Sequence, residues 1–131
     1  MNSVAIDIAD YLDEMSSLGL VFGTDVFVGR EPPKPDNCVT IFDTYGRPPQ
    51  LNMVDQGYEY PSIQIRVRNR NYEDGWGVIS DIKDVLHGMN HTTINGTLYT
   101  VIYVSSGPTL LDWDENSRAR FILNLELQRR D

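Results

Sequence analysis

The sequence has a single cysteine, Cys38, among its 131 residues. One thiol cannot close an internal disulfide, and it leaves a four-thiolate metal site without ligands. A chain of this length buries roughly 68% of the surface that its unfolded form exposes, which is enough for a stable core without disulfides or bound metal. The sequence therefore favours a reducing compartment, and folding is expected to need no cofactor.

Positive charge is also scarce, since 11 lysines and arginines face 19 aspartates and glutamates, for a formal net charge of −8. That sign is wrong for a protein whose affinity comes from neutralising phosphates, so a general nucleic-acid binder is not expected. No apolar run approaches the length of a membrane span. The first residues carry acids where a secretory signal needs a basic start, so we expect neither membrane insertion nor that route of secretion.

Residues with metal-binding chemistry are few. The only two histidines, His87 and His91, are four apart, which places two ligands on one helical face. Gly88 and Asn90 lie between them and favour fraying there, and no glutamate accompanies the pair as a general base. The better interpretation is that both histidines lie exposed at the end of a helix, where they interact favourably with the helix dipole.

Asp112, Asp114 and Asn116 repeat the first three ligand positions of a calcium loop. Ser117 stands where that loop needs glycine, and Leu123 replaces its closing glutamate, so a polar turn is expected. No serine or cysteine lies in a nucleophile-elbow context. We therefore predict no catalytic, cofactor-binding or metal-binding residues, no cofactor, and a protein that is not an enzyme.

Two segments carry apolar residues at the three- and four-residue spacing of an amphipathic helix. The first spans residues 4–18, with Ser3 as its N-cap and Gly19 as a left-handed stop. The second opens at Tyr72 and ends close to Gly88.

Strands are indicated by β-branched and aromatic residues and by alternation. Short strands are expected within residues 20–28 and 38–42, and residues 63–67 alternate between apolar and polar side chains. The dipeptide at residues 95–96, Asn-Gly, favours a type I′ turn and predicts a hairpin. A last strand over residues 119–128 turns its apolar side chains to one side.

These elements predict one domain over residues 1–131 with an α/β (α+β) fold. Two amphipathic helices would pack on one face of a mostly antiparallel or mixed β-sheet, and the second helix would cross between neighbouring strands. Trp76 and Phe121 lie on the apolar sides of their elements, so both are expected in the core.

Two charged surfaces of opposite sign are candidates for an interface. The first helix is expected to turn Asp7, Asp10, Asp13 and Glu14 away from its apolar stripe. The strand at residues 63–67 and its continuation carry Arg66, Arg68 and Arg70 on the side opposite the core. Solvation explains both, but Asp7, Asp10 and Glu14 of one copy could also pair with the three arginines of the next.

A long connection over residues 46–60 has no periodicity. Connections of that length inside a compact domain are usually functional or mobile. Leu51, Met53 and Val54 give it apolar side chains that could dock on a partner, so we predict a partner contact there.

Several motifs, in order along nearly the whole chain, resemble one family. They are YPSIQIRVR at residues 60–68 followed by Tyr72 and Trp76, PDNCVTIFDTYG at 35–46, INGTLY at 94–99, SGP at 106–108, and a loop at 114–120 that leads into FILNLEL at 121–127. Together they resemble the small minor capsid proteins of tailed bacteriophages in the tail terminator group, also described as head–tail joining proteins.

This resemblance implies a structural virion protein of the tail or neck, assembled in the host cytoplasm. Its subunits would form a homo-oligomer, typically a hexameric ring, that stops growth of the tail tube and presents a surface to the head connector or stopper protein. DNA would pass through the lumen without specific binding, for which an acidic protein is suited. The resemblance brings no catalytic motif.

Two alternatives remain open from the sequence. The chain could be a neck or tail-completion subunit at a different position in the same kind of particle. It could also be a small enzyme or ligand-binding module with a pocket near the long connection and Trp113, although no polar cluster of that kind is visible.

Overall fold

The computed structural model describes residues 1–47 and 58–130. The elements in chain order are α1 (Val4–Glu14), β1 (Val26–Val28), β2 (Cys38–Arg47), β3 (Tyr60–Asn69), α2 (Tyr72–Leu86), β4 (Met89–Ile94), β5 (Thr97–Trp113) and β6 (Ala119–Arg130). The strands form one sheet in the order β1-β2-β3-β6-β5-β4. Only β1 and β2 are parallel, and the other neighbours are antiparallel.

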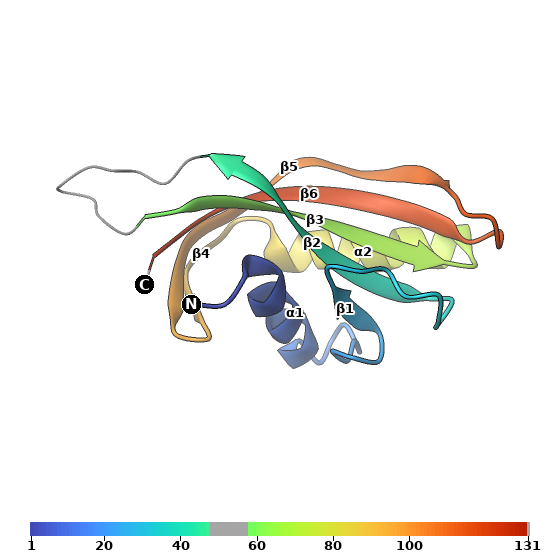
Figure 1. Cartoon of the computed structure of the whole chain (residues 1–131), viewed down its shortest axis with the longest axis horizontal. Coiled ribbons are helices and arrows are strands. Elements are labelled where there is room, and N and C mark those ends of the chain that lie inside the picture. The colour runs from blue at the N-terminus through green and yellow to red at the C-terminus, as the bar shows by residue number, and fades with distance from the viewer. Residues whose placement is uncertain (48–57, 131) are drawn as a thin grey trace.

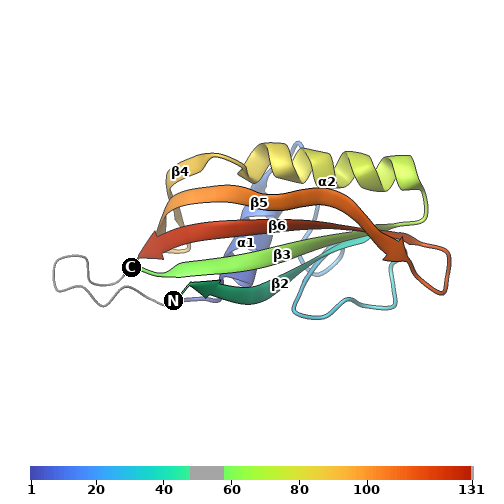
Figure 2. The same ribbon diagram turned by 90° about the horizontal axis from the view of Figure 1, so that it is seen from above.

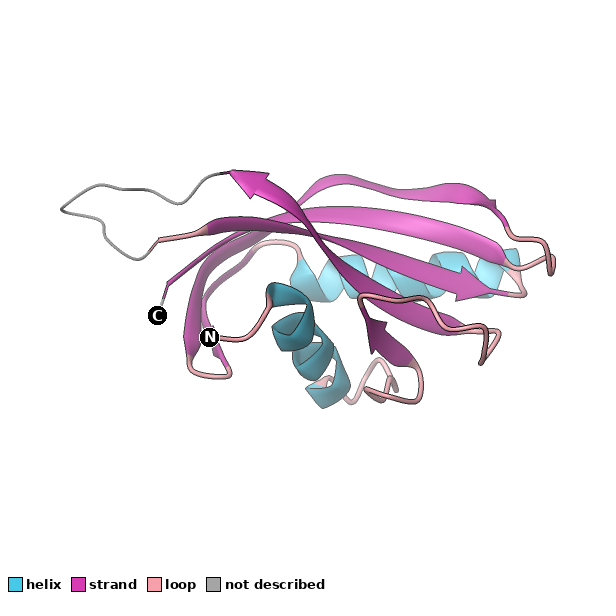
Figure 3. Ribbon diagram, in the orientation of Figure 1, coloured by secondary structure: helices cyan, strands magenta, loops and turns pink. Residues whose placement is uncertain are grey.

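Both helices pack on the same face of this twisted sheet (Figures 1 and 3). The expected α+β fold, a mixed sheet with two helices on one face, is thus confirmed. One detail is wrong: α2 does not cross between neighbouring strands. It joins β3 to β4, and both β6 and β5 lie between those strands in the sheet.

Helix α1 begins where the sequence predicts, because the Ser3 hydroxyl accepts a hydrogen bond from the backbone N–H of Ile6 at 3.3 Å. It ends at Glu14 rather than at residue 18, and the chain then runs through a turn to Gly19, whose φ is +66°. The expected strand over residues 20–28 is reduced to the three residues of β1.

Helix α2 is capped by the Asn71 side chain, which accepts from the backbone N–H of Asp74 at 3.0 Å. It approaches β6 closely at Gly75, where a Cβ would lie 2.7 Å from Phe121 Cε2. Phe121 is fully buried, as predicted, but Trp76 is 41% exposed, so its assignment to the core is wrong. Trp76 packs edge-on against Phe121 with ring centroids 6.0 Å apart and leaves the rest of its indole in solvent.

The core lies between the helices and the facing side of the sheet. Alternation puts Ile63, Ile65 and Val67 of β3 on this side. Its largest fully buried side chains are Tyr99, Phe121, Ile8, Leu12, Ile41, Ile63, Ile65, Ile79, Ile82, Leu86, Ile102 and Leu123. The face of the sheet without helices is turned toward the viewer in Figure 2.

The predicted hairpin joins β4 and β5 through Asn95 and Gly96, whose φ values are +51° and +80°. Strand β5 has 17 residues and four register shifts against β6. Strand β4 pairs with β5 only as far as Ile102. Within the described part of the chain, residues 103–113 of β5 therefore have no strand on their outer side.

Candidate assembly surface

A short proline-rich segment, residues 31–37, packs against arginines where β3 ends and β6 begins, and we call it the strap. It supplies carboxylates from Glu31 and Asp36 and backbone carbonyls from its prolines. Four arginines approach it from the sheet and its ends, namely Arg68, Arg70, Arg118 and Arg120. The strap therefore occupies much of the basic surface that the sequence indicates.

Arg68 is the most deeply placed of these cations, with 2% of its side chain exposed. Its Nε donates to the Asp36 carbonyl at 3.1 Å, and its Nη2 donates to the Pro35 carbonyl at 2.6 Å. Its Nη1 lies 3.4 Å from Glu31 Oε1. The expectation that Arg68 faces solvent on an open strand is wrong, because the strap covers it.

Arg70 and Arg66 differ from Arg68 and from each other. Arg70 Nε donates to Asp36 Oδ2 at 2.6 Å, but 64% of its side chain remains exposed. Arg66 is partly buried, with its guanidinium carbon 5.0 Å from the centroid of the Phe42 ring. The three arginines thus lie in three environments, and they do not form one free basic stripe.

The strap is also tied to the start of β6. Arg120 donates from Nε and Nη2 to the two oxygens of Asp112, at 2.7 and 2.6 Å, and its Nη1 donates to Glu31. Arg118 donates from Nη1 to the Pro33 carbonyl at 2.9 Å and to Asp36 Oδ1 at 3.2 Å.

These pairs shift the acidities of the carboxylates. The hydrogen bond from Arg70, with a further one from Arg118, lowers the pKa of Asp36 below its usual value near 3.8. The hydrogen bond from Arg120 likewise lowers the pKa of Asp112. Both carboxylates therefore keep their charge, and with it their ion pairs with these arginines, to lower pH than free aspartate would.

Asp114 confirms the polar-turn interpretation of the segment that resembles a calcium loop. Its Oδ1 accepts from the backbone N–H groups of Asn116 and Arg118, each at 2.9 Å. Its Oδ2 accepts from Arg118 Nε at 2.7 Å. The carboxylate is fully used in closing the β5–β6 turn. Among residues 1–47 and 58–130, no cluster of three or more metal-ligating side chains is found.

Asp7 is buried, which contradicts its expected place on an acidic outer face of α1. Its Oδ2 accepts from the Tyr99 hydroxyl at 2.5 Å, its Oδ1 accepts from Asn95 Nδ2 at 2.9 Å, and Arg129 Nη1 lies 3.9 Å away. The sequence contains the signal for this, because Asp7 follows Val4 by three residues, a spacing that keeps both on one helical face.

The remaining predicted interface residues have mixed outcomes. Asp10 accepts from Asn95 Nδ2 at 2.8 Å, whereas Glu14 is exposed. The interface role of Asp10, Glu14, Arg66 and Arg70 stays a prediction, and any pairing between copies cannot use the buried Asp7 and Arg68. Leu51, Met53 and Val54 lie outside the described residues.

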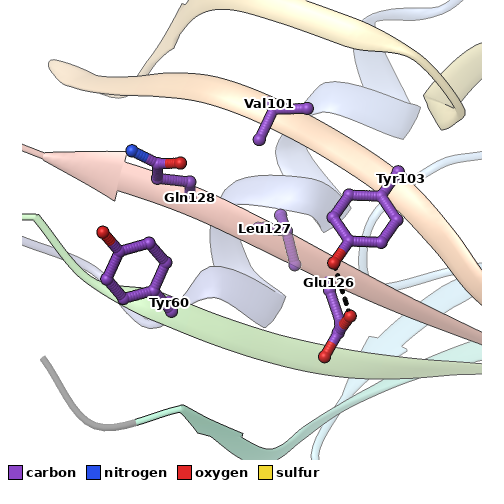
Figure 4. Close-up of a pocket in the computed structure, with 6 residues that line it drawn as sticks. All are labelled: Tyr60, Val101, Tyr103, Glu126, Leu127 and Gln128. Carbon is purple, nitrogen blue, oxygen red and sulfur yellow. Dashed lines mark hydrogen bonds between the residues drawn. The ribbon is translucent and has the colours of Figure 1, made fainter.

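A small cavity opens between the ends of β3, β6 and β5 (Figure 4). It is lined by Tyr60, Val101, Tyr103, Glu126, Leu127 and Gln128, and the Tyr103 hydroxyl donates to Glu126 Oε2 at 2.6 Å. Its volume of about 50 Å³ is well below that of typical small-molecule pockets.

Large apolar side chains gather where α2 begins and β5 ends. Tyr72 and Trp76 are 45% and 41% exposed, and both rings pack edge-on against Phe121. Leu110 pairs with Phe121 across the sheet, and Trp113, 51% exposed, pairs with Ala119, so both point to the same face. We call Tyr72, Trp76, Leu110 and Trp113 the aromatic corner. Sequence reasoning missed it, because it assigned Trp76 to the core.

Comparison with known proteins decides the family. The model of the family described as "Bacteriophage tail terminator protein" matches residues 14–130. The chain belongs to the bacteriophage tail terminator family. The match runs from the last residue of α1 through β6 and so includes all six strands of the sheet.

As a tail terminator family member, the chain is a structural protein of the phage tail and a component of a virion. A solved chain from the "Virion of native gene transfer agent (GTA) particle" has the same fold, with a TM-score of 0.63 at 15% sequence identity. The alignment covers 97% of this chain and 96% of that one. No curated protein matches the sequence. Among the helices of the described residues, none is long and apolar enough to span a membrane.

Proposed function

We propose that this chain is a single tail-terminator domain, residues 1–131, whose copies form a ring, typically of six, at the head-proximal end of a phage tail. The ring stops growth of the tail tube and connects the tube to the head connector or stopper protein. The observation that carries this proposal is the family match from residue 14 to residue 130, which follows the chain through every strand of the sheet.

The charge distribution supports passage of DNA through such a ring without specific binding. The chain has a net charge of −8, and its arginines 68, 70, 118, 120 and 129 are each engaged by a carboxylate of the same chain. Arginines that are already paired with carboxylates are poorly placed to bind DNA phosphates, and an acidic surface repels those phosphates. The lumen can therefore let DNA slide.

The function can be tested in a phage that lacks the gene for this chain. A terminator defect predicts tails of uncontrolled length that do not join heads, and supplying the chain should restore both length and joining. Tails of normal length that still fail to join heads would instead favour the alternative of a neck or tail-completion subunit. Gold labelling of a tagged chain should mark the head-proximal tail end.

A further inference from the structure

The aromatic corner is bordered by acidic side chains. Glu73 and Asp74 lie beside Tyr72 in the first turn of α2, and Glu115 follows Trp113 in the turn after β5; all three are exposed. Within the described part of the chain, no ion pair engages them. Exposed tryptophan and tyrosine clustered in this way are typical of protein interfaces.

A groove of matching character lies on the opposite flank, beside β1. It is an open space of about 630 Å³ lined by Gly23, Thr24, Phe27, Lys34, Pro35 and Asp36. Phe27 and Pro35 supply apolar surface. The exposed Lys34 supplies positive charge to this lining, and the Asp36 carboxylate in the lining is paired with Arg70 and Arg118. Arg30, two residues after β1, is also exposed, and among the described residues no carboxylate forms an ion pair with Lys34 or Arg30.

The register of the sheet sets the two surfaces at the same height along the strands, with Phe27 of the groove on the sheet face opposite that of Leu110. Val26, Val39, Val67, Phe121 and Leu110 are successive partners across five strands and form a single row. Strand β1, next to the groove, and Leu110, in the aromatic corner, are the two ends of this row. At about 4.8 Å per strand, they lie roughly 20 Å apart. Figure 2 shows α2 along one long side of the sheet and β2, the neighbour of β1, along the other.

We propose that the acidic aromatic corner of one subunit docks into the basic groove beside β1 of a second copy of this chain. The proposal rests on the ring proposed above and names the two surfaces that would build it. One subunit then carries both halves of a heterologous contact, the type that closes into a ring when the rotation between copies is right. The outer edge of β5 beyond Ile102 lies on the same flank and faces the neighbour.

Strand direction agrees with this contact. Strand β5 runs antiparallel to β1 through the chain of pairings β1-β2-β3-β6-β5. A neighbour that keeps the same orientation therefore brings β1 alongside β5 in antiparallel sense. The outer backbone groups of Val26 already bond to Val21 and Gly23, so side chains would make the contact rather than a continued sheet.

Charge is the reason to choose a second copy as the occupant. The chain as a whole is strongly acidic, but Lys34 in the groove lining and Arg30 just after β1 are exposed cations without a carboxylate partner among the described residues. Glu73, Asp74 and Glu115 supply the complement on the other flank. Matching charges of this kind set the register of an interface and disfavour the wrong faces.

Cross-linking tests which surfaces meet. In particles that carry the double variant Lys34→Cys/Glu73→Cys, a short bismaleimide should join neighbouring copies into a ladder up to the full ring, and neither single variant should give it. Lys34→Cys/Asp84→Cys is the matched control, since Asp84 is an exposed acid near the other end of α2. Cys38 is 4% exposed and contributes little background. Absence of the ladder, or an equal ladder from the control, overturns the proposal.

Charge reversal gives a second test on the purified chain by sedimentation. Glu73→Lys/Asp74→Lys should weaken self-association at least tenfold, and adding Arg30→Glu/Lys34→Glu in the same chain should restore most of it. Asp81→Lys/Asp84→Lys makes the same charge change on the same helix and should leave association unchanged. A reversal with no effect, or without rescue, contradicts the contact.

The two proposals fail in distinguishable ways. If gold labelling marks the tail end but the cross-linked ladder is absent, the chain is a terminator whose subunits meet by other surfaces. If the charge reversal weakens self-association of the purified chain and is rescued as expected, but labelling does not mark the tail end, the contact stands and the proposed function fails.

Discussion

Arg68 of β3 and Glu31 of the strap meet with Nη1 and Oε1 3.4 Å apart, and only 2% of the arginine side chain is exposed. A charge this well covered must be matched inside the chain, because water cannot solvate it. The same strap leaves Arg70 at its edge. Arg68 and Arg70, two positions apart in the sequence, therefore form ion pairs that contribute very differently to stability.

Replacing Arg68 by methionine should destabilise the fold by about 3–5 kcal/mol, because it leaves the Glu31 carboxylate and two strap carbonyls with fewer partners. Arg70→Met removes an ion pair that is 64% exposed on the arginine side and should cost at most about 1 kcal/mol. Urea unfolding followed by tryptophan fluorescence measures both. Equal losses would show that the strap does not bury Arg68 in solution.

Removing the buried carboxylate of α1 should also be costly. Asp7→Ala takes away the acceptor for Tyr99 and Asn95 and should destabilise by about 3 kcal/mol. Asp13→Ala is the matched control on the same helix, where the side chain is exposed, and should stay within about 0.5 kcal/mol of the parent. Denaturant midpoints distinguish the two. A neutral Asp7→Ala would mean that α1 presents this face to solvent.

Two glycines of α2 should respond oppositely to alanine. At Gly75 a Cβ would lie 2.7 Å from Phe121 Cε2 and 3.0 Å from Asn69 Cβ, so Gly75→Ala should destabilise by about 1–3 kcal/mol. At Gly77 nothing lies within 4 Å, and Gly77→Ala should stabilise by up to about 1 kcal/mol through helix propensity. Thermal unfolding measures the sign of the stability change for each of the two variants. Stabilisation by Gly75→Ala would contradict the close contact between α2 and β6.

The pKa of Asp36 should rise toward its usual value near 3.8 when its main partner is removed in Arg70→Gln. A carboxyl whose pKa is lowered by folding contributes stability that is full above about pH 3.8 and is lost as the pH falls through the lower folded-state pKa. Arg70→Gln should therefore reduce the stability lost on acidification through that range. Carboxyl NMR titration reports the pKa, with Arg30→Gln as a control that leaves it unchanged.

Local chemistry made much of the fold predictable. Alternation identified the core face of β3, Ser3 fixed the start of α1, and Asn95-Gly96 fixed the β4–β5 hairpin. Each of these features depends on residues within a few positions of one another, so periodicity and turn preferences are sufficient to find them.

The candidate site was less predictable, because its contacts are remote in sequence. Arg68 meets the Asp36 carbonyl 32 positions away, and Arg120 meets Glu31 89 positions away. A strand pattern shows that Arg68 and Val67 point to opposite faces of the sheet, but it does not show what covers the polar face. Trp76 was misplaced for a related reason: its helix face is apolar, but the sheet ends beside it with Leu110 and Trp113 still exposed.

The position of β6 has a consequence for when the protein can fold. This strand is the last in the sequence, yet it lies in the middle of the sheet and joins β3 to β5. On the ribosome, the first half of the sheet and the β4–β5 hairpin emerge without the strand that unites them, and Phe121 is still missing from beneath α2. The native core therefore forms only after β6, through residue 130, has left the exit tunnel, so assembly through the completed sheet must wait for that strand.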